Sequence, residues 1–159
     1  MMTPESLGKL AEELLEIKAN DKFADFCCGA GTVVADVVKN HPTVEAYGFD
    51  KLVSYIAIAK IYNDLSEGKI TFEAKDIFEL GLDEDNGRRF DKIFANYPFG
   101  MRIKELGLGN QYLEQLEKRI PSVSKVTSSD WLFNSVMVDM LSEDGKAVGI
   151  MTNGSTWNQ

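Results

Sequence analysis

Four consecutive residues, Asn96, Tyr97, Pro98 and Phe99, carry the groups needed for chemistry on a planar amino nitrogen. The lone pair of such an amine is delocalised into its ring, so the nitrogen attacks a methyl donor only when acceptors hold its two protons. The side-chain oxygen of Asn96 and the main-chain carbonyl of Tyr97 suit this role, and Phe99 suits stacking on an extruded base. We therefore predict that Asn96, Tyr97, Pro98 and Phe99 form a catalytic site for methyl transfer that needs neither a metal nor a covalent intermediate.

A glycine-containing turn near the N-terminus is predicted to bind a cofactor. The turn runs from Asp25 to Thr32 and contains Gly29 and Gly31, which let backbone amides approach a ligand closely. The carboxylate of Asp25 can hold a charged amino group by hydrogen bonds. A nicotinamide dinucleotide site would have a third small residue three positions after Gly31, where this chain has Val34, so the pattern disfavours a dinucleotide.

Two further acids stand at the ends of later apolar segments. Asp50 can accept hydrogen bonds from both hydroxyls of a ribose, and Asp76 with Ile77 can accept from the amino group of an adenine and cover its ring. Aspartate is also well suited to cap a helix, so capping is the alternative interpretation for each acid. Because the glycine turn and both acids follow predicted strands, we expect one adenosine-bearing ligand to contact all three.

These residues must be positioned by alternating strands and helices. A first helix is predicted over residues 3–19, with Thr3 as its cap, Pro4 in its first turn, and an apolar face made of Leu7, Leu10, Ala11, Leu14 and Leu15. Strands are expected at residues 22–26, 44–49, 69–74, 90–95 and 146–151. Helices are expected after the first two strands and near residues 111–119 and 129–141. This alternation predicts an α/β fold with a mostly parallel, Rossmann-like sheet and helices on both faces.

The composition is that of one folded domain. The chain has 159 residues, of which 44% are hydrophobic, and a formal net charge of -8. No apolar run is long enough to cross a bilayer and no signal-peptide pattern opens the chain, so we expect a cytoplasmic protein without membrane association. Cys27 and Cys28 are adjacent and suggest small buried groups rather than a disulfide framework or a metal cluster. The net charge opposes binding to phosphates, but residues 97–129 carry five basic and three acidic side chains, so any DNA-facing surface is expected there.

Taken together, these motifs resemble those of the N6-adenine DNA methyltransferases, and most closely those of the modification subunit of type I restriction-modification systems. The resemblance extends over nearly the whole chain. It includes the opening Thr3 and Pro4, the loop with Asp25, Cys28, Gly29, Gly31 and Thr32, the acids Asp50 and Asp76, and residues 96–100 and 145–153. That family usually has proline where this sequence has Tyr97, but the contact there is a main-chain carbonyl, which survives the substitution.

The resemblance implies a class I S-adenosylmethionine-dependent methyltransferase that modifies N6 of adenine in DNA. It implies a specificity subunit and other restriction-modification subunits as partners. It implies that S-adenosylmethionine is bound by Thr3, Asp25, Cys28, Gly29, Gly31, Thr32, Asp50, Asp76, Ile77 and Asn96. Because such folds continue with an antiparallel hairpin, residues 1–159, with a core over residues 22–159, are expected to be a single domain truncated at its C-terminus. The open edge of its last strand is expected to favour self-association.

Two other functions fit the same residues. An Asn-x-Pro-aromatic site can also grip an RNA base or the amide of a protein glutamine, with the same cofactor. A non-catalytic cofactor-binding subunit or remnant is the third interpretation, because Tyr97 departs from the usual pattern and a target-recognition region is missing.

Overall fold

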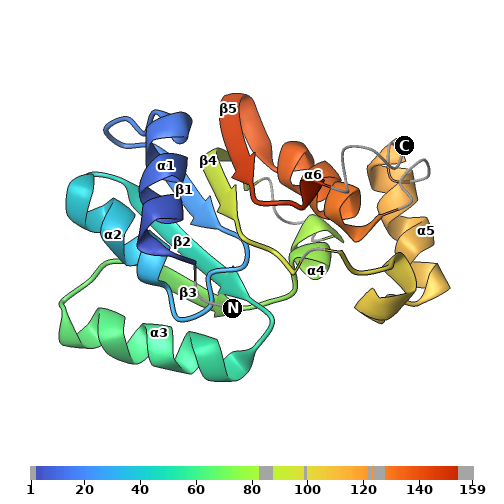
Figure 1. The fold of residues 1–159 in the computed structure, drawn as a ribbon, viewed down its shortest axis with the longest axis horizontal. Coiled ribbons are helices and arrows are strands. Elements are labelled where there is room, and N and C mark those ends of the chain that lie inside the picture. Colours follow the sequence, from blue (N-terminus) through green and yellow to red (C-terminus); the bar gives the residue numbers. More distant parts are fainter. Residues whose placement is uncertain (1–2, 83–87, 99, 122, 124–127, 154–159) are drawn as a thin grey trace.

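A computed structural model describes residues 3–82, 88–98, 100–121, 123 and 128–153. Five strands form one sheet in the order β3-β2-β1-β4-β5, and every neighbouring pair is parallel (Figure 1). The strands are β1 (Lys22–Asp25), β2 (Glu45–Asp50), β3 (Thr71–Ala74), β4 (Phe90–Ala95) and β5 (Leu141–Gly149). The predicted α/β fold with a parallel sheet is confirmed.

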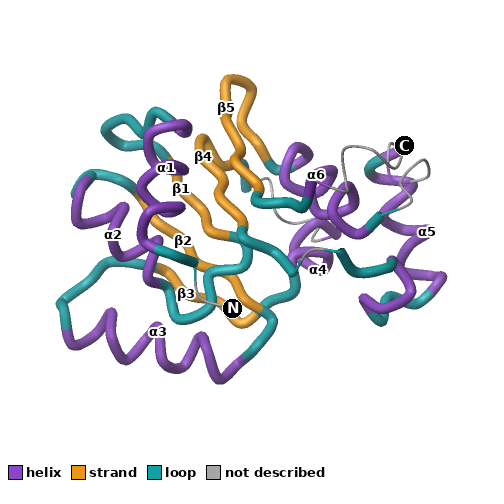
Figure 2. The backbone as a smooth tube through the Cα atoms, viewed as in Figure 1, coloured by secondary structure: helices purple, strands orange, loops and turns teal. Residues whose placement is uncertain are grey.

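Helices cover both faces of this sheet. In the view of Figure 2, one group lies to the left of and below the strands and the other lies to the right. The first group contains α1 (Glu5–Leu15), α2 (Thr32–Asn40) and α3 (Val53–Leu65). The second group contains α4 (Ile77–Leu82), α5 (Asn110–Arg119) and α6 (Ser129–Asp139), and a short 3-10 helix, η1 (Ile103–Leu106), precedes α5. None of the described helices is long and apolar enough to span a membrane.

The side chains of the central strands point alternately to the two faces of the sheet, and this divides the core into two layers. Phe23 of β1 and Phe94 of β4 pack with the first group of helices, whereas the neighbouring Ala24 and Ile93 pack with the second group. Successive side chains of a strand point to opposite faces, so a strand that is apolar at every position must be covered on both sides. In β4 the apolar run Ile93, Phe94 and Ala95 is fully buried and covered on both faces, which accounts for the place of this strand inside the sheet.

The first helix differs from the prediction at both ends. It begins after Pro4, which takes the cap position, and no side chain caps it. It ends at Leu15, because Glu16 adopts a left-handed conformation with φ of 51°. The predicted apolar face is only partly buried: Ala11 and Leu15 are covered, whereas the three leucines Leu7, Leu10 and Leu14 are exposed.

The second half of the chain shows two further differences. Helix α4 directly follows Asp76, where no helix was predicted, because Ile77, Phe78 and Leu80 find buried positions there. Strand β5 begins at Leu141 rather than at residue 146 and its register against β4 shifts between Phe90 and Lys92. The predicted helix over residues 111–119 is confirmed as α5.

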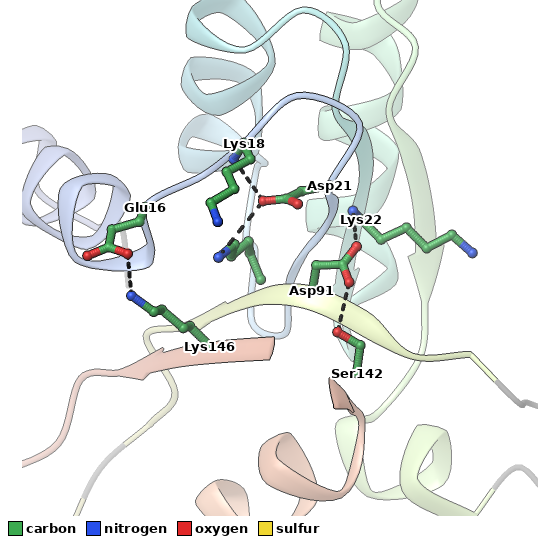
Figure 3. Close-up of polar contacts among 8 residues, drawn as sticks. Glu16, Lys18, Asp21, Lys22, Asp91, Ser142 and Lys146 are labelled. Carbon is green, nitrogen blue, oxygen red and sulfur yellow. Dashed lines mark hydrogen bonds and ion pairs between the residues drawn. The ribbon is translucent and has the colours of Figure 1, made fainter. Parts of the chain in front are cut away.

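Polar contacts tie the strands together at their amino ends (Figure 3). The carboxylate of Asp91 accepts a hydrogen bond from the backbone amide of Lys22 at 2.8 Å and another from the Ser142 hydroxyl at 2.7 Å. The ammonium of Lys92 lies 3.9 Å from Asp21. Because these contacts join β1, β4 and β5 at the end opposite to the candidate site, they stabilise the sheet without entering that site.

Candidate functional site

The carboxyl ends of four strands surround a pocket of about 370 Å³. In a parallel sheet these ends lie along one edge, where ligands of open α/β folds bind. Seven of the predicted site residues line the pocket: Gly29, Asp50, Asp76, Ile77, Asn96, Tyr97 and Pro98. Phe99, which was predicted to stack on the target base, lies outside the described residues.

Backbone hydrogen bonds hold the glycine turn across the ends of β2 and β4. The amide of Phe26 donates to the carbonyl of Phe94 at 2.9 Å, and the amide of Cys28 donates to the carbonyl of Phe49 at 2.9 Å. Gly31 has φ of 81°, and a Cβ atom there would lie 2.6 Å from the ring of Phe72. Close packing against β3 is therefore a sufficient reason for glycine at position 31.

Asp50 links the end of β2 to the glycine turn. One carboxylate oxygen accepts from the amide of Gly29 at 2.9 Å and the other accepts from the amide of Leu52 at 2.9 Å. The cap position of α3 is taken by Leu52, so Asp50 is not the cap of that helix. Each carboxylate oxygen can accept a second hydrogen bond, which leaves Asp50 able to bind ribose hydroxyls while it holds the turn.

Asp76, in contrast, does act as a helix cap. Its side chain accepts from the amide of Phe78 at 3.0 Å, and its carbonyl accepts from the amide of Leu80 at 2.9 Å, at the start of α4. The following Ile77 is buried and lines the pocket. Capping fixes the carboxylate at the pocket wall, so the structural and the binding interpretations are compatible at this residue.

Asp25 lies beneath the turn and not at the pocket surface. The side chain is buried and accepts a hydrogen bond from the amide of Cys27 at 3.2 Å. Burial raises the pKa of Asp25 to about 7, the Cys27 hydrogen bond opposes this shift, and the negative charge of Asp50 adds to it. Burial likewise raises the pKa of the Cys27 and Cys28 thiols. Cys28 is a small buried group as predicted, whereas Cys27 is half-buried and lines the pocket.

Four other predicted cofactor residues also lie off the pocket wall: Thr3, Cys28, Gly31 and Thr32. Thr3 nevertheless reaches the site through Asn96. The side-chain nitrogen of Asn96 donates to the hydroxyl of Thr3 at 3.1 Å, across 93 positions of sequence. The helix-cap role predicted for Thr3 is wrong, because its hydroxyl is used to orient Asn96. With the nitrogen fixed towards Thr3, the amide oxygen of Asn96 points to the other side.

The ring of Tyr97 is turned into the core and not into the pocket. It stacks on Phe133 with ring centroids 4.7 Å apart and planes 2° apart, and its hydroxyl donates to the side-chain oxygen of Asn134 at 3.0 Å. Burial raises the pKa of this hydroxyl. Pro98 is exposed. The phenol of Tyr97 is therefore a packing group, and the main chain is the part of this residue that chemistry can use.

Sequence reasoning missed two residues that hold the loop after Pro98. Asp130 accepts a hydrogen bond from the amide of Gly100 at 3.2 Å, and the Ser129 hydroxyl donates to the carbonyl of Met101 at 2.7 Å. Both side chains are buried at the start of α6. Their sequence signal is that of an ordinary helix start, so only the tertiary structure identifies what they contact.

The fold is that of the Rossmann-like class I S-adenosylmethionine-dependent methyltransferases. Three features define this class here: the strand order, the parallel sheet and the pocket at its carboxyl edge. The chain is similar to TrmN from Thermus thermophilus, with 20% identity and a TM-score of 0.67 over 94% of this chain and 38% of that protein. A Listeria monocytogenes protein assigned to this class matches with 21% identity and a TM-score of 0.71, over 99% and 48% of the two chains. Coclaurine N-methyltransferase, solved with N-methylheliamine and SAH, matches with 12% identity and a TM-score of 0.63, over 91% and 34%.

Sequence comparison identifies the family within this class. The sequence model of the N-6 DNA methylase family matches residues 1–159, so the chain belongs to that family. A search of curated protein sequences gave no match. The chain spans less than half the length of each of the three solved structures described above.

Proposed function

We propose that this chain binds S-adenosylmethionine and transfers its methyl group to N6 of adenine in DNA, as part of the modification subunit of a restriction-modification system. The observation that carries the proposal is the geometry at the end of β4. The Asn96 amide nitrogen donates to Thr3, which turns the amide oxygen to the other side, and Asn96 and Tyr97 both line the pocket. Membership of the N-6 DNA methylase family supports the same target.

The pocket has the size and the chemistry to hold the cofactor. Its volume of about 370 Å³ falls within the range of small-molecule sites. Asp50 would bind the ribose hydroxyls, while Asp76 and Ile77 would contact the adenine. The backbone of Gly29 would lie against the methionine end. Asp25, beneath the same turn, would stabilise the positive amino group of that end through the turn rather than by direct contact. When bound, the cofactor supplies an electrophilic methyl group on a sulfonium centre.

The residues after β4 would then activate the target amine. The Asn96 oxygen and the Tyr97 carbonyl would each accept a hydrogen bond from one N–H group of N6, which would free the lone pair of the nitrogen for in-line attack. Attack by the nitrogen would form a carbon–nitrogen bond as the methyl–sulfur bond of the donor breaks, and one proton of the methylated amine would be lost to solvent. Because no paired base can reach this edge of the sheet, the adenine must first leave the helix. Phe99 would stack on it there.

Transfer of a labelled methyl group tests the proposed target. The chain would be incubated with radiolabelled S-adenosylmethionine and, in separate reactions, unmethylated DNA, RNA and a glutamine-containing peptide. We expect label in DNA, recovered as N6-methyladenine after digestion, and loss of that label in Asn96→Ala. Label in RNA or in the peptide alone would replace DNA as the target. Cofactor binding without transfer to any of the three would select a non-catalytic cofactor-binding subunit.

A further inference from the structure

One face of α6 holds the loop that follows Asn96 at several points. Ser129 and Asp130, in the first turn, bind the main chain of Met101 and Gly100. Phe133 stacks on the ring of Tyr97, one turn further along the helix. Side chains three and four positions apart share one face of a helix, so these contacts come from a single surface of α6.

The polar side chains of this surface make hydrogen bonds to the loop. Ser129 and Asp130 have 0% and 1% of their surface exposed. Burying a hydroxyl and a carboxylate costs free energy unless hydrogen bonds compensate, and here groups of the loop supply such bonds. The cap residue Ser128 makes no side-chain hydrogen bond to the helix end. The polar groups at the start of α6 are therefore directed at the loop.

The contacts lie on both sides of Pro98. Before it, the Tyr97 hydroxyl donates to Asn134 at 3.0 Å; after it, the Gly100 amide donates to Asp130 at 3.2 Å. A proline at position 97 would restrict the main chain through its own ring. In this chain the buried Tyr97 ring provides a comparable restriction through packing and one hydrogen bond. The Tyr97 carbonyl is thus fixed by α6.

We propose that Asp130 and Asn134 are positioning residues for methyl transfer. They fix the two sides of the loop so that the Asn96 oxygen and the Tyr97 carbonyl present the geometry that the target amine requires. This proposal rests on the proposed function. Neither residue lies among the contacts assigned to the cofactor, so their loss should reduce the rate of transfer and leave cofactor affinity unchanged. Misplacing a reacting group by about 1 Å costs on the order of 100-fold in rate.

The test compares Asp130→Ala, Asp130→Asn and Asn134→Ala with the wild-type chain. Calorimetry measures the Kd for S-adenosylmethionine, and steady-state transfer to unmethylated DNA gives kcat and KM. We expect kcat to fall about tenfold to 100-fold in the two alanine variants, with the Kd for the cofactor within about twofold of wild type. Asp130→Asn keeps an acceptor for the Gly100 amide and should recover most of the lost kcat.

A matched pair of serine variants separates positioning from stability. Ser129→Ala removes a 2.7 Å hydrogen bond to the loop, and Ser142→Ala removes a 2.7 Å hydrogen bond to Asp91 at the far end of the sheet. Both should lower Tm by similar amounts, but only Ser129→Ala should lower kcat.

If the variants of Asp130, Asn134 and Ser129 had the same kcat as Ser142→Ala, the positioning role would be overturned, but the proposed function would not. Loss of cofactor affinity in parallel with kcat would also overturn it. Absence of transfer by the wild-type chain would instead refute the proposed function, and the positioning role with it.

Discussion

At the scale of single residues, folding brings the ionisation of Asp25 into the neutral pH range. Its carboxyl is buried beneath the glycine turn, and burial raises its pKa from 3.8 to about 7. The folded chain therefore binds a proton at Asp25 more tightly than the unfolded chain does. The resulting contribution to stability is fully present below about pH 4 and is lost as the pH rises to about 7.

Asp25→Asn should remove this pH dependence. The variant keeps a side-chain oxygen for the Cys27 amide but cannot ionise. We expect the free energy of unfolding of the wild-type chain to fall relative to that of the variant between pH 4 and 7, by on the order of 3 kcal/mol. Urea unfolding of both chains at several pH values measures the difference. Parallel curves would show that Asp25 is ionised in the folded chain across this range.

The position of the site could be predicted from residue types, but the direction of individual side chains could not. Asn96, Asp50 and Asp76 were placed correctly at strand ends because a short apolar segment followed by a polar residue marks such an end. The role of Thr3 was wrong, because its partner Asn96 lies 93 positions away and no local pattern reports that contact. The burial of the Tyr97 ring could likewise not be predicted from the sequence, because it depends on contacts with Phe133 and Asn134.

At the scale of elements, the glycine turn is held by packing as well as by hydrogen bonds. Gly31 combines φ of 81° with a Cβ position only 2.6 Å from Phe72 of β3. Gly31→Ala should lower the free energy of unfolding by about 1–3 kcal/mol, because the new methyl group strains the backbone and displaces the ring.

Gly109→Ala is the matched control, since nothing lies within 4 Å of a Cβ at that position. It should cost about 1 kcal/mol or less, because alanine is a poorer cap residue than glycine but fits the extended backbone of Gly109 without strain and lowers the entropy of the unfolded chain. Equal losses of stability in the two variants, measured by urea unfolding, would contradict the packing role of Gly31.

Most elements were predictable, and the exceptions have physical causes. Strand β4 was placed at its observed bounds because Phe90 and the apolar run from Ile93 to Ala95 mark a buried strand that ends directly before the polar Asn96. Helix α4 was missed because its six residues are too few to show helical periodicity. The end of α1 was misplaced because Glu16, a poor candidate for a left-handed conformation, closes the helix.

At the scale of the whole molecule, the sheet has an open edge at β5. Within the described part of the chain, β5 pairs with β4 alone. An unpaired edge offers main-chain donors and acceptors to another strand, so we predict self-association. Sedimentation velocity should show a sedimentation coefficient that rises with concentration, and the exposed edge substitution Ala147→Lys should suppress the rise. Monomeric behaviour at every concentration in the unsubstituted chain would contradict this prediction.

The central claim is that the pocket at the strand ends binds S-adenosylmethionine, and calorimetric titration of three chains tests it most directly. Asp50→Ala removes the carboxylate at the end of β2, and Asp91→Ala removes one at the opposite end of the sheet that also accepts a backbone hydrogen bond. We predict saturable binding to the wild-type chain and to Asp91→Ala, and binding at least tenfold weaker to Asp50→Ala, because hydrogen bonds to a charged group contribute about 1.5–3 kcal/mol. Equal affinity in all three chains, or no binding to a folded wild-type chain, would contradict the claim.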